Sequence, residues 1–294
     1  MDKGLSGFWL LDKPAEITSR KFLDQVSNKL EWKKAGHTGT LDPLATGLMV
    51  LVSGEACKLQ HIFTGFSKEY IATLYLGAST DTDDREGNIQ IMENAPIPTL
   101  QQIQSILQTF VGEQQQIPPI HSAIKVNGRR AYKMARKGHE VQMPIRNITI
   151  HSLSLLSYQY PLLECKVHCS SGTYIRALAR DIGEKLQTKA YLQKLRRTKI
   201  GEWDIAKAHT LETITQQDKI SLEIALEQYP KIHIFPEQTF AIQNGQRIPW
   251  EKLPPQSIPQ NKDTPVFIWS QDKIIAFAKY NEKTVSSAKT ILSE

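Results

Sequence analysis

The residues best suited to chemistry lie in one short segment, residues 35–47, which reads AGHTGTLDPLATG. Its three glycines and its proline disfavour a regular helix or strand, so we expect a loop. Pro43 also biases Asp42 away from helical backbone geometry. A carboxylate held rigidly in such a loop could act as a nucleophile or as a base. An ordinary Gly/Pro turn with a solvated aspartate is the alternative, and the loop alone does not decide.

Two other groups of residues invite a metal interpretation. The acidic run DTDDRE at 81–86 resembles part of a calcium loop but lacks the glutamate at the twelfth position. Cys165 and Cys169 have no second ligand pair at zinc-site spacing, and in a strand they would point with Val167 to one buried face. The odd total of three cysteines argues against a disulfide framework. We therefore predict no metal site.

The net charge of +6 and the pI of about 9.0 suit a polyanionic partner. The excess is concentrated in residues 117–146, where Glu140 is the only acid. On charge alone, an RNA-binding segment and a solvated surface loop are equally good interpretations. Asn127-Gly128 predicts a tight turn within it. A short basic helix is predicted over 132–137.

Hydrophobic spacing predicts the elements that would position these residues. Thr18-Ser19 offers an N-cap for a helix over 21–30. Further helices are predicted over 99–111 and 174–186, and another opens at 210–214. Strands are predicted at 8–12, 48–52, 69–77, 148–158 and 162–169. From about residue 235 the pattern changes to short β-like segments, including 266–269 and 274–278, which indicates a second small domain.

The chain has no apolar run long enough to span a bilayer, and its first residues lack the features of a signal peptide. A cytosolic location is therefore expected.

The segment GHTGTLDPLATG closely resembles the catalytic loop of the TruB family, the bacterial tRNA pseudouridine-55 synthases. Other segments resemble that family in the same order, over about residues 8–212, and the tail does so only loosely. They are LLDKP (10–14), KEYIATLYLG (68–77), TDTDDREG (80–87), IPPIHSAIKVNGRRAYKMARKG (117–138), CSSGTYIRALARDIGEKL (169–186) and LRRTKIG (195–201).

The resemblance implies an α+β fold, with a mixed, mainly antiparallel sheet flanked by helices and a central active-site cleft. Residues 1–232 would form the catalytic domain, with an RNA-clamping thumb inserted at about 117–146. Residues 235–294 would form a small β-rich, PUA-type RNA-binding domain.

The resemblance also implies roles for individual residues. Asp42 matches the essential aspartate, and Arg176 matches the arginine that would keep it ionised and oriented. Tyr70 matches the active-site tyrosine, which can stack on a uracil and move a proton; without the family it reads as a core aromatic. The other matches are Tyr174 and Leu195 in the pocket wall, His37 against the RNA, Lys13 beneath the loop, Asp84 in the RNA-facing loop, and Lys125, Arg129, Arg130, Lys133, Arg136 and Lys137 in the thumb.

One position departs from the family, because His121 stands where tyrosine is usual. We expect activity to be retained, with a shift in RNA affinity or in pH dependence.

By the same resemblance, the reaction needs no cofactor. The C1′–N1 bond of a uridine breaks, uracil turns, and C5 bonds to C1′. Asp42 could trap C1′ covalently or remove a ribose proton to form a glycal, and we favour the second route. The substrate would be the flipped T-loop uridine of tRNA, handled by a monomer without a protein partner or a membrane. Two alternatives are a non-catalytic tRNA-binding or folding protein and a metal-dependent nuclease, for which the ligand set is incomplete.

Overall fold

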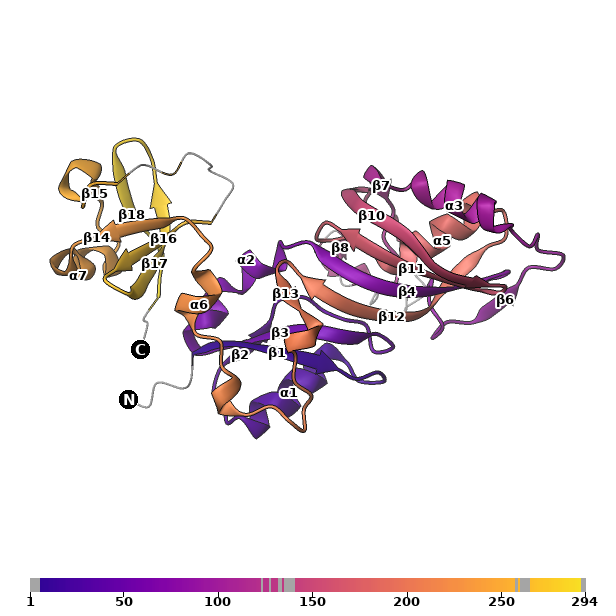
Figure 1. The fold of residues 1–294 in the computed structure, drawn as a ribbon, viewed down its shortest axis with the longest axis horizontal. Helices are drawn as coiled ribbons and strands as arrows, with labels where there is room; N and C mark the ends of the chain where they lie inside the picture. The colour runs from indigo at the N-terminus through magenta and orange to yellow at the C-terminus, as the bar shows by residue number, and fades with distance from the viewer. Residues whose placement is uncertain are drawn as a thin grey trace.

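The computed structural model describes residues 6–122, 124–126, 128–131, 134, 141–256, 259 and 265–291. The described chain forms a large mixed sheet with helices packed on it and a smaller β-rich unit at the C-terminal end (Figure 1). This is the α+β arrangement that the sequence predicts. No helix among the described residues is long and apolar enough to cross a membrane.

The large sheet runs in the order β1-β3-β12-β4-β11-β10-β7, with β2 added to β3 and β13 added to β12. Its pairs are antiparallel except for β12 with β3, which are parallel. The strands are β1 (Gly7–Lys13), β2 (Ala35–His37), β3 (Thr46–Ser53), β4 (Lys68–Leu76), β7 (Gly112–Gln116), β10 (Arg146–Gln159), β11 (Leu162–Cys169), β12 (Ala190–Ile200) and β13 (Trp203–Asp204).

Two short hairpins extend from the body of the sheet. One joins β5 (Ala78–Thr80) to β6 (Ile89–Ile91), and the other joins β8 (Lys125–Val126) to β9 (Arg129–Arg130). Gly128 in the second hairpin has φ +78°, a conformation that favours glycine. The strand pairing on either side therefore agrees with the predicted turn, although Asn127 itself lies outside the described residues.

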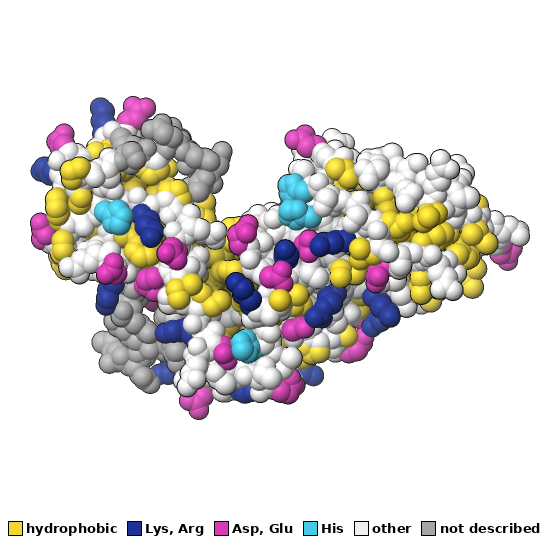
Figure 2. Space-filling model, viewed as in Figure 1, with side chains coloured by type: hydrophobic (Ala, Val, Ile, Leu, Met, Phe, Trp, Pro, Cys, Tyr) yellow, Lys and Arg dark blue, Asp and Glu magenta, His cyan; other side chains and the backbone are white. Residues whose placement is uncertain are grey.

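Helices α1 (Ser19–Lys29), α3 (Leu100–Gln108) and α5 (Ile175–Lys185) bury their apolar faces in one core with the inner face of β4. The Thr18 hydroxyl caps α1 by accepting from the Lys21 amide, as predicted. The opposite face of the sheet carries the ion pair between Lys166 and Glu69, at 3.0 Å. Figure 2 shows Lys, Arg, Asp and Glu side chains scattered among apolar ones over this view of the molecule.

The second sheet has the order β14-β16-β17-β18-β15 and begins at Lys231. Phe267 and Trp269 of its β16 pack in a core shared with Phe8 of β1 and Phe63, so the two sheets are joined through buried side chains. Its elements are β14 (Lys231–Ile234), α7 (Thr239–Gln243), β15 (Ile248–Pro249), β16 (Phe267–Ser270), β17 (Lys273–Tyr280) and β18 (Thr284–Thr290). Short helices α2 (Gln60–Thr64) and α6 (Leu222–Leu226) lie near the junction.

Two predictions of secondary structure are wrong. The helix expected to open at 210–214 is a turn, because the Lys29 amine takes up the carbonyls of Leu211 and Glu212, and the Thr213 hydroxyl bonds the Thr210 amide. The loop expected over 35–47 is shorter, because Ala35–His37 and Thr46-Gly47 are drawn into β2 and β3 by strand pairing.

Candidate active site

The loop that carries Asp42 is fixed on both sides of that residue. The Ser19 hydroxyl bonds both the amide and the carbonyl of Leu41, at 2.8 and 2.7 Å. The amine of Lys13, which is fully buried, donates to the carbonyl of Pro43 at 3.3 Å. Burial lowers the pKa of Lys13 to about 8. These bonds give the Asp42 carboxylate a defined position, as a catalytic group requires.

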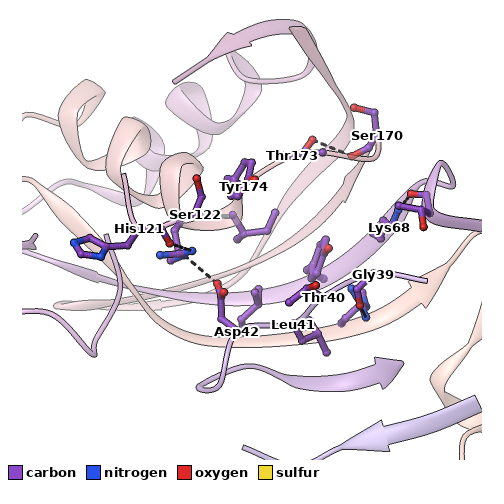
Figure 3. Close-up of a pocket in the computed structure, with 17 residues that line it drawn as sticks. Gly39, Thr40, Leu41, Asp42, Lys68, His121, Ser122, Ser170, Thr173 and Tyr174 are labelled. Carbon is purple, nitrogen blue, oxygen red and sulfur yellow. Dashed lines mark hydrogen bonds and ion pairs between the residues drawn. The ribbon is translucent and has the colours of Figure 1, made fainter. Parts of the chain in front are cut away.

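Asp42 lines a cavity of about 380 Å³ between the loop, the start of α5 and the strands β4 and β12 (Figure 3). Tyr70, Tyr174, Arg176 and Leu195 also line it. The structure therefore brings together five of the residues predicted from the sequence, although they are up to 153 positions apart in the chain.

Arg176 is the centre of the acidic end of this cavity. Its Nε lies 3.0 Å from Asp42 Oδ2, and its Nη1 lies 3.3 Å from Asp84 Oδ2. The guanidinium also donates to the carbonyls of Thr82 and His121, both at 3.1 Å. Only 7 % of the arginine side chain is exposed. One buried cation thus orients two carboxylates, of which only Asp42 reaches the cavity.

Burial raises the pKa of the Asp42 carboxyl above its ordinary value, and Asp84 adds to the rise. The Arg176 guanidinium acts in the opposite direction but does not cancel the rise. The expectation that Arg176 orients Asp42 agrees with the ion pair, whereas burial outweighs the support that Arg176 gives to the ionised form of Asp42. A carboxylate with a raised pKa is a stronger base, which suits proton abstraction.

Tyr70 lies directly opposite Arg197 in the pairing of β4 with β12, so the phenol and the guanidinium influence each other's pKa. Arg197 is 1 % exposed and donates to the carbonyls of Leu48 and Gly39, at 2.7 and 3.1 Å. Gly47 allows this packing, because a Cβ there would lie 2.3 Å from the Arg197 carbonyl oxygen. Burial raises the pKa of Tyr70, and Arg197 opposes the rise.

Lys68 is a second buried cation in the cavity wall. Its amine donates to the carbonyls of Thr64 and Phe66, each at 2.6 Å, and burial lowers its pKa to about 8. Within the described part of the chain, no carboxylate pairs with Lys68 or Arg197. Figure 3 places Lys68 and Gly39 away from Asp42 and His121. The cavity therefore has an acidic end and a cationic end.

Sequence reasoning did not single out Lys68 and Arg197. A signal was available, because side chains two apart on a strand share a face. Lys68 precedes Tyr70 by two positions, and Arg197 follows Leu195 by two.

The remaining predicted residues lie outside the cavity wall. Asp84 is behind Arg176, and Lys13 is beneath the loop. His37 is in β2 and does not line the cavity; burial lowers its pKa, and its Nδ1 has no hydrogen-bond partner among the described residues.

The backbones of Lys125 and Arg130 pair in the β8–β9 hairpin, and Arg129 is exposed. Lys133, Arg136, Lys137 and most of the predicted helix at 132–137 lie outside the described residues.

The acidic run at 81–86 does not converge on one point. Asp81 accepts from Asn88, Asp83 pairs with Arg180 at 2.8 Å, and Asp84 pairs with Arg176. Among the residues that the structure describes, no group of three or more His, Cys, Asp or Glu side chains could hold a metal ion.

Comparison with known proteins agrees with this geometry. Two family models, both of pseudouridylate synthases, together match most of the chain. Residues 27–175 match the N-terminal domain of the TruB family pseudouridylate synthases, and residues 176–237 match the C-terminal domain of tRNA pseudouridylate synthase B. The chain belongs to the TruB family.

Two relatives are both named tRNA pseudouridine synthase B. The one from Azoarcus sp. strain BH72 is 40 % identical over 251 residues, covering 83 % of each chain. The one from Caldicellulosiruptor saccharolyticus is 44 % identical over 219 residues, covering 74 % of this chain and 76 % of the relative. A chain in the crystal structure of the archaeal box H/ACA sRNP Nop10–Cbf5 complex shares the fold, with a TM-score of 0.73, 21 % identity, and coverage of 99 % of this chain and 88 % of that one.

Proposed function

We propose that this chain converts the T-loop uridine of tRNA, at position 55, to pseudouridine, with Asp42 as the catalytic carboxylate. One observation carries the proposal: in a chain of the TruB family, Asp42 lies in a cavity wall and is paired with the buried Arg176 at 3.0 Å.

The uridine must leave the base stack before it can enter this cavity, and unstacking costs a few kcal/mol, to be offset by contacts inside. Tyr70, Tyr174 and Leu195 offer two aromatic surfaces and one aliphatic surface for the flipped base. These contacts would hold the uracil while its bond to ribose is broken.

The C1′–N1 bond breaks with its electron pair remaining on the uracil, so negative charge develops on the base. Lys68 and Arg197 are cations without a carboxylate partner in the described structure, and both line the cavity. They would favour that negative charge in a low-dielectric site. Asp42, at the other end of the cavity, would remove the C2′ proton to give a glycal.

After the uracil rotates, C5 bonds to C1′, and the C2′ proton returns from Asp42. The hydrogen on C5 then leaves as a proton while N1 gains one, and Tyr70 can relay this transfer by donating its hydroxyl proton to N1 and taking the proton from C5. A covalent ester between Asp42 and C1′ is the alternative route. Deuterium at C2′ would slow the glycal route when chemistry limits the rate, and an unchanged single-turnover rate would favour the ester.

Two regions would bind the rest of the tRNA outside the cavity. The basic segment 117–146 would neutralise phosphates without reading sequence. The C-terminal β-rich unit would act as a PUA-type domain against the tRNA backbone. A monomer suffices for both contacts.

The experiment is incubation of purified protein with an unmodified tRNA transcript, without metal or cofactor, followed by carbodiimide-stop primer extension. We expect a single stop in the T-loop. A transcript with cytidine at that position is the matched control and should give no stop. Tight tRNA binding without any stop would support the non-catalytic RNA-binding alternative, and strand cleavage would support a nuclease.

A further inference from the structure

Gln116 is a buried polar residue at the point where β7 ends and the basic segment 117–146 begins. It is 3 % exposed, and its amide forms two hydrogen bonds to the backbone of one residue, Tyr174. Its Oε1 accepts from the Tyr174 amide at 2.8 Å, and its Nε2 donates to the Tyr174 carbonyl at 3.1 Å. The side chain therefore binds Tyr174 much as a neighbouring strand would.

Tyr174 is the N-cap residue of α5, and its own side chain forms no capping hydrogen bond. Amides at a helix start need partners from outside the helix. The Tyr174 carbonyl also accepts the first helical bond, from the Leu178 amide at 3.0 Å. Gln116 thus fixes the start of α5 from outside, and Arg176 follows two residues later.

Two further bonds connect the start of the basic segment to α5. Arg180 donates to the carbonyl of Ile117 at 2.9 Å, and Arg176 donates to the carbonyl of His121 at 3.1 Å. The chain from Gln116 to His121 is therefore bound to α5 and its N-cap at three places, one of which is the arginine that holds Asp42.

We propose that Gln116 is a positioning residue that couples the basic segment to the active site, by fixing Tyr174 and the first turn of α5 so that Arg176 meets Asp42. This inference rests on the proposed function. When RNA docks on the basic segment, the Gln116–Tyr174 bonds transmit the position of the segment to the catalytic pair. Loss of the bonds leaves RNA binding in place and slows the chemical step.

The first test compares Gln116→Met with wild type in single-turnover pseudouridine formation and in tRNA binding. Methionine keeps the length of the side chain and removes both hydrogen bonds. We expect a loss of about tenfold in rate, with the Kd for tRNA changed by less than about twofold. Gln115→Met is the matched control, because Gln115 is the exposed neighbour on the same strand, and its rate should equal that of wild type.

A second variant separates positioning from general damage. In Gln116→Glu, an ionised carboxylate would face the Tyr174 carbonyl with an acceptor in place of a donor. Once protonated, the carboxyl can donate again. Burial raises the pKa of such a carboxyl, so we expect the rate relative to wild type to recover as the pH falls from about 8 to about 6. The relative rate of Gln116→Met should not change over that range.

The inference is overturned if Gln116→Met reacts at the wild-type rate, or if its rate loss follows from an equal loss of tRNA affinity. It is also overturned if Gln116→Glu shows no recovery at low pH. If Gln116→Met does not fold, the pH dependence of Gln116→Glu decides. Inactive wild-type protein would instead contradict the proposed function, so the two failures are distinguishable.

Discussion

The two ends of the cavity each contain a buried arginine, but the arginines have opposite surroundings. Arg176 lies between two carboxylates, Asp42 and Asp84. Arg197 bonds two backbone carbonyls and lies opposite Tyr70, and Lys68 bonds two more carbonyls. The acidic end pairs one cation with two acids, whereas the two cations of the cationic end have no acidic partner among the described residues.

This difference matches the charges that the proposed reaction creates. A base at the ribose must be oriented and available to take a proton, which the Arg176 pair and the raised pKa of Asp42 provide. The departing uracil carries negative charge, and two cations without acidic partners favour it. Substitutions made at one end of the cavity at a time test this match.

The largest effect should come from the acidic end. Arg176→Lys keeps the positive charge but loses the planar fork that reaches Asp42 and Asp84 together. We expect the single-turnover rate to fall roughly 10³-fold, with tRNA affinity little changed. Quenched-flow measurement of pseudouridine checks this, and a thermal melt controls for folding. A rate within about threefold of wild type would show that the pairing of Arg176 with Asp42 is not needed for the chemical step.

At the cationic end, Tyr70→Phe removes the hydroxyl and keeps the aromatic ring. We expect a loss of roughly 10²-fold in the single-turnover rate, because a positioned proton carrier is missing while stacking remains. Binding of tRNA, measured by filter retention, should stay within about twofold of wild type. A large loss of binding with an unchanged rate would make Tyr70 a stacking residue only.

Lys68→Met should have a smaller and pH-dependent effect. Lys68 has a pKa of about 8, so its amine is charged below that pH and neutral above it. Wild type should exceed Lys68→Met by roughly tenfold at low pH, and the advantage should shrink as the pH rises through about 8. Rate ratios measured across that range check the sign. Lys68→Arg, which keeps its charge, is the control and should show no such change.

The smallest effect is expected at His121. Its backbone carbonyl, rather than its ring, accepts from Arg176, so replacement of the ring preserves that bond. We expect His121→Tyr to change tRNA affinity by a few fold and to leave the single-turnover rate near that of wild type. If the tRNA affinity and the pH profile of His121→Tyr are both identical to those of wild type, the departure from the family pattern has no consequence.

Much of the acidic end was predictable, because its signals are local. The glycines and Pro43 mark the loop around Asp42, and apolar spacing marks the helix that carries Arg176. The order of the matching segments along the chain then identifies the family. For His37, a motif position gave a role against the RNA, which stays a prediction, because the residue lies in β2 outside the cavity wall.

The cationic end depends on long-range pairing. Arg197 meets Tyr70 only because β12 and β4 pair in one register, across more than a hundred residues of chain. Hydrophobic spacing does not specify that register. The failed helix at 210–214 has a similar cause, because its carbonyls bond Lys29, which is distant in the sequence.

The most direct test of the central claim replaces Asp42 with asparagine, which has almost the same shape. When C5 bonds to C1′, the hydrogen on C5 is released, so tRNA labelled with tritium at uridine C5 reports turnover. We predict that Asp42→Asn binds tRNA within about threefold of wild type and releases tritium at least about 10⁴-fold more slowly. Release by Asp42→Asn within about tenfold of the wild-type rate would contradict the account and assign the chemistry to another residue.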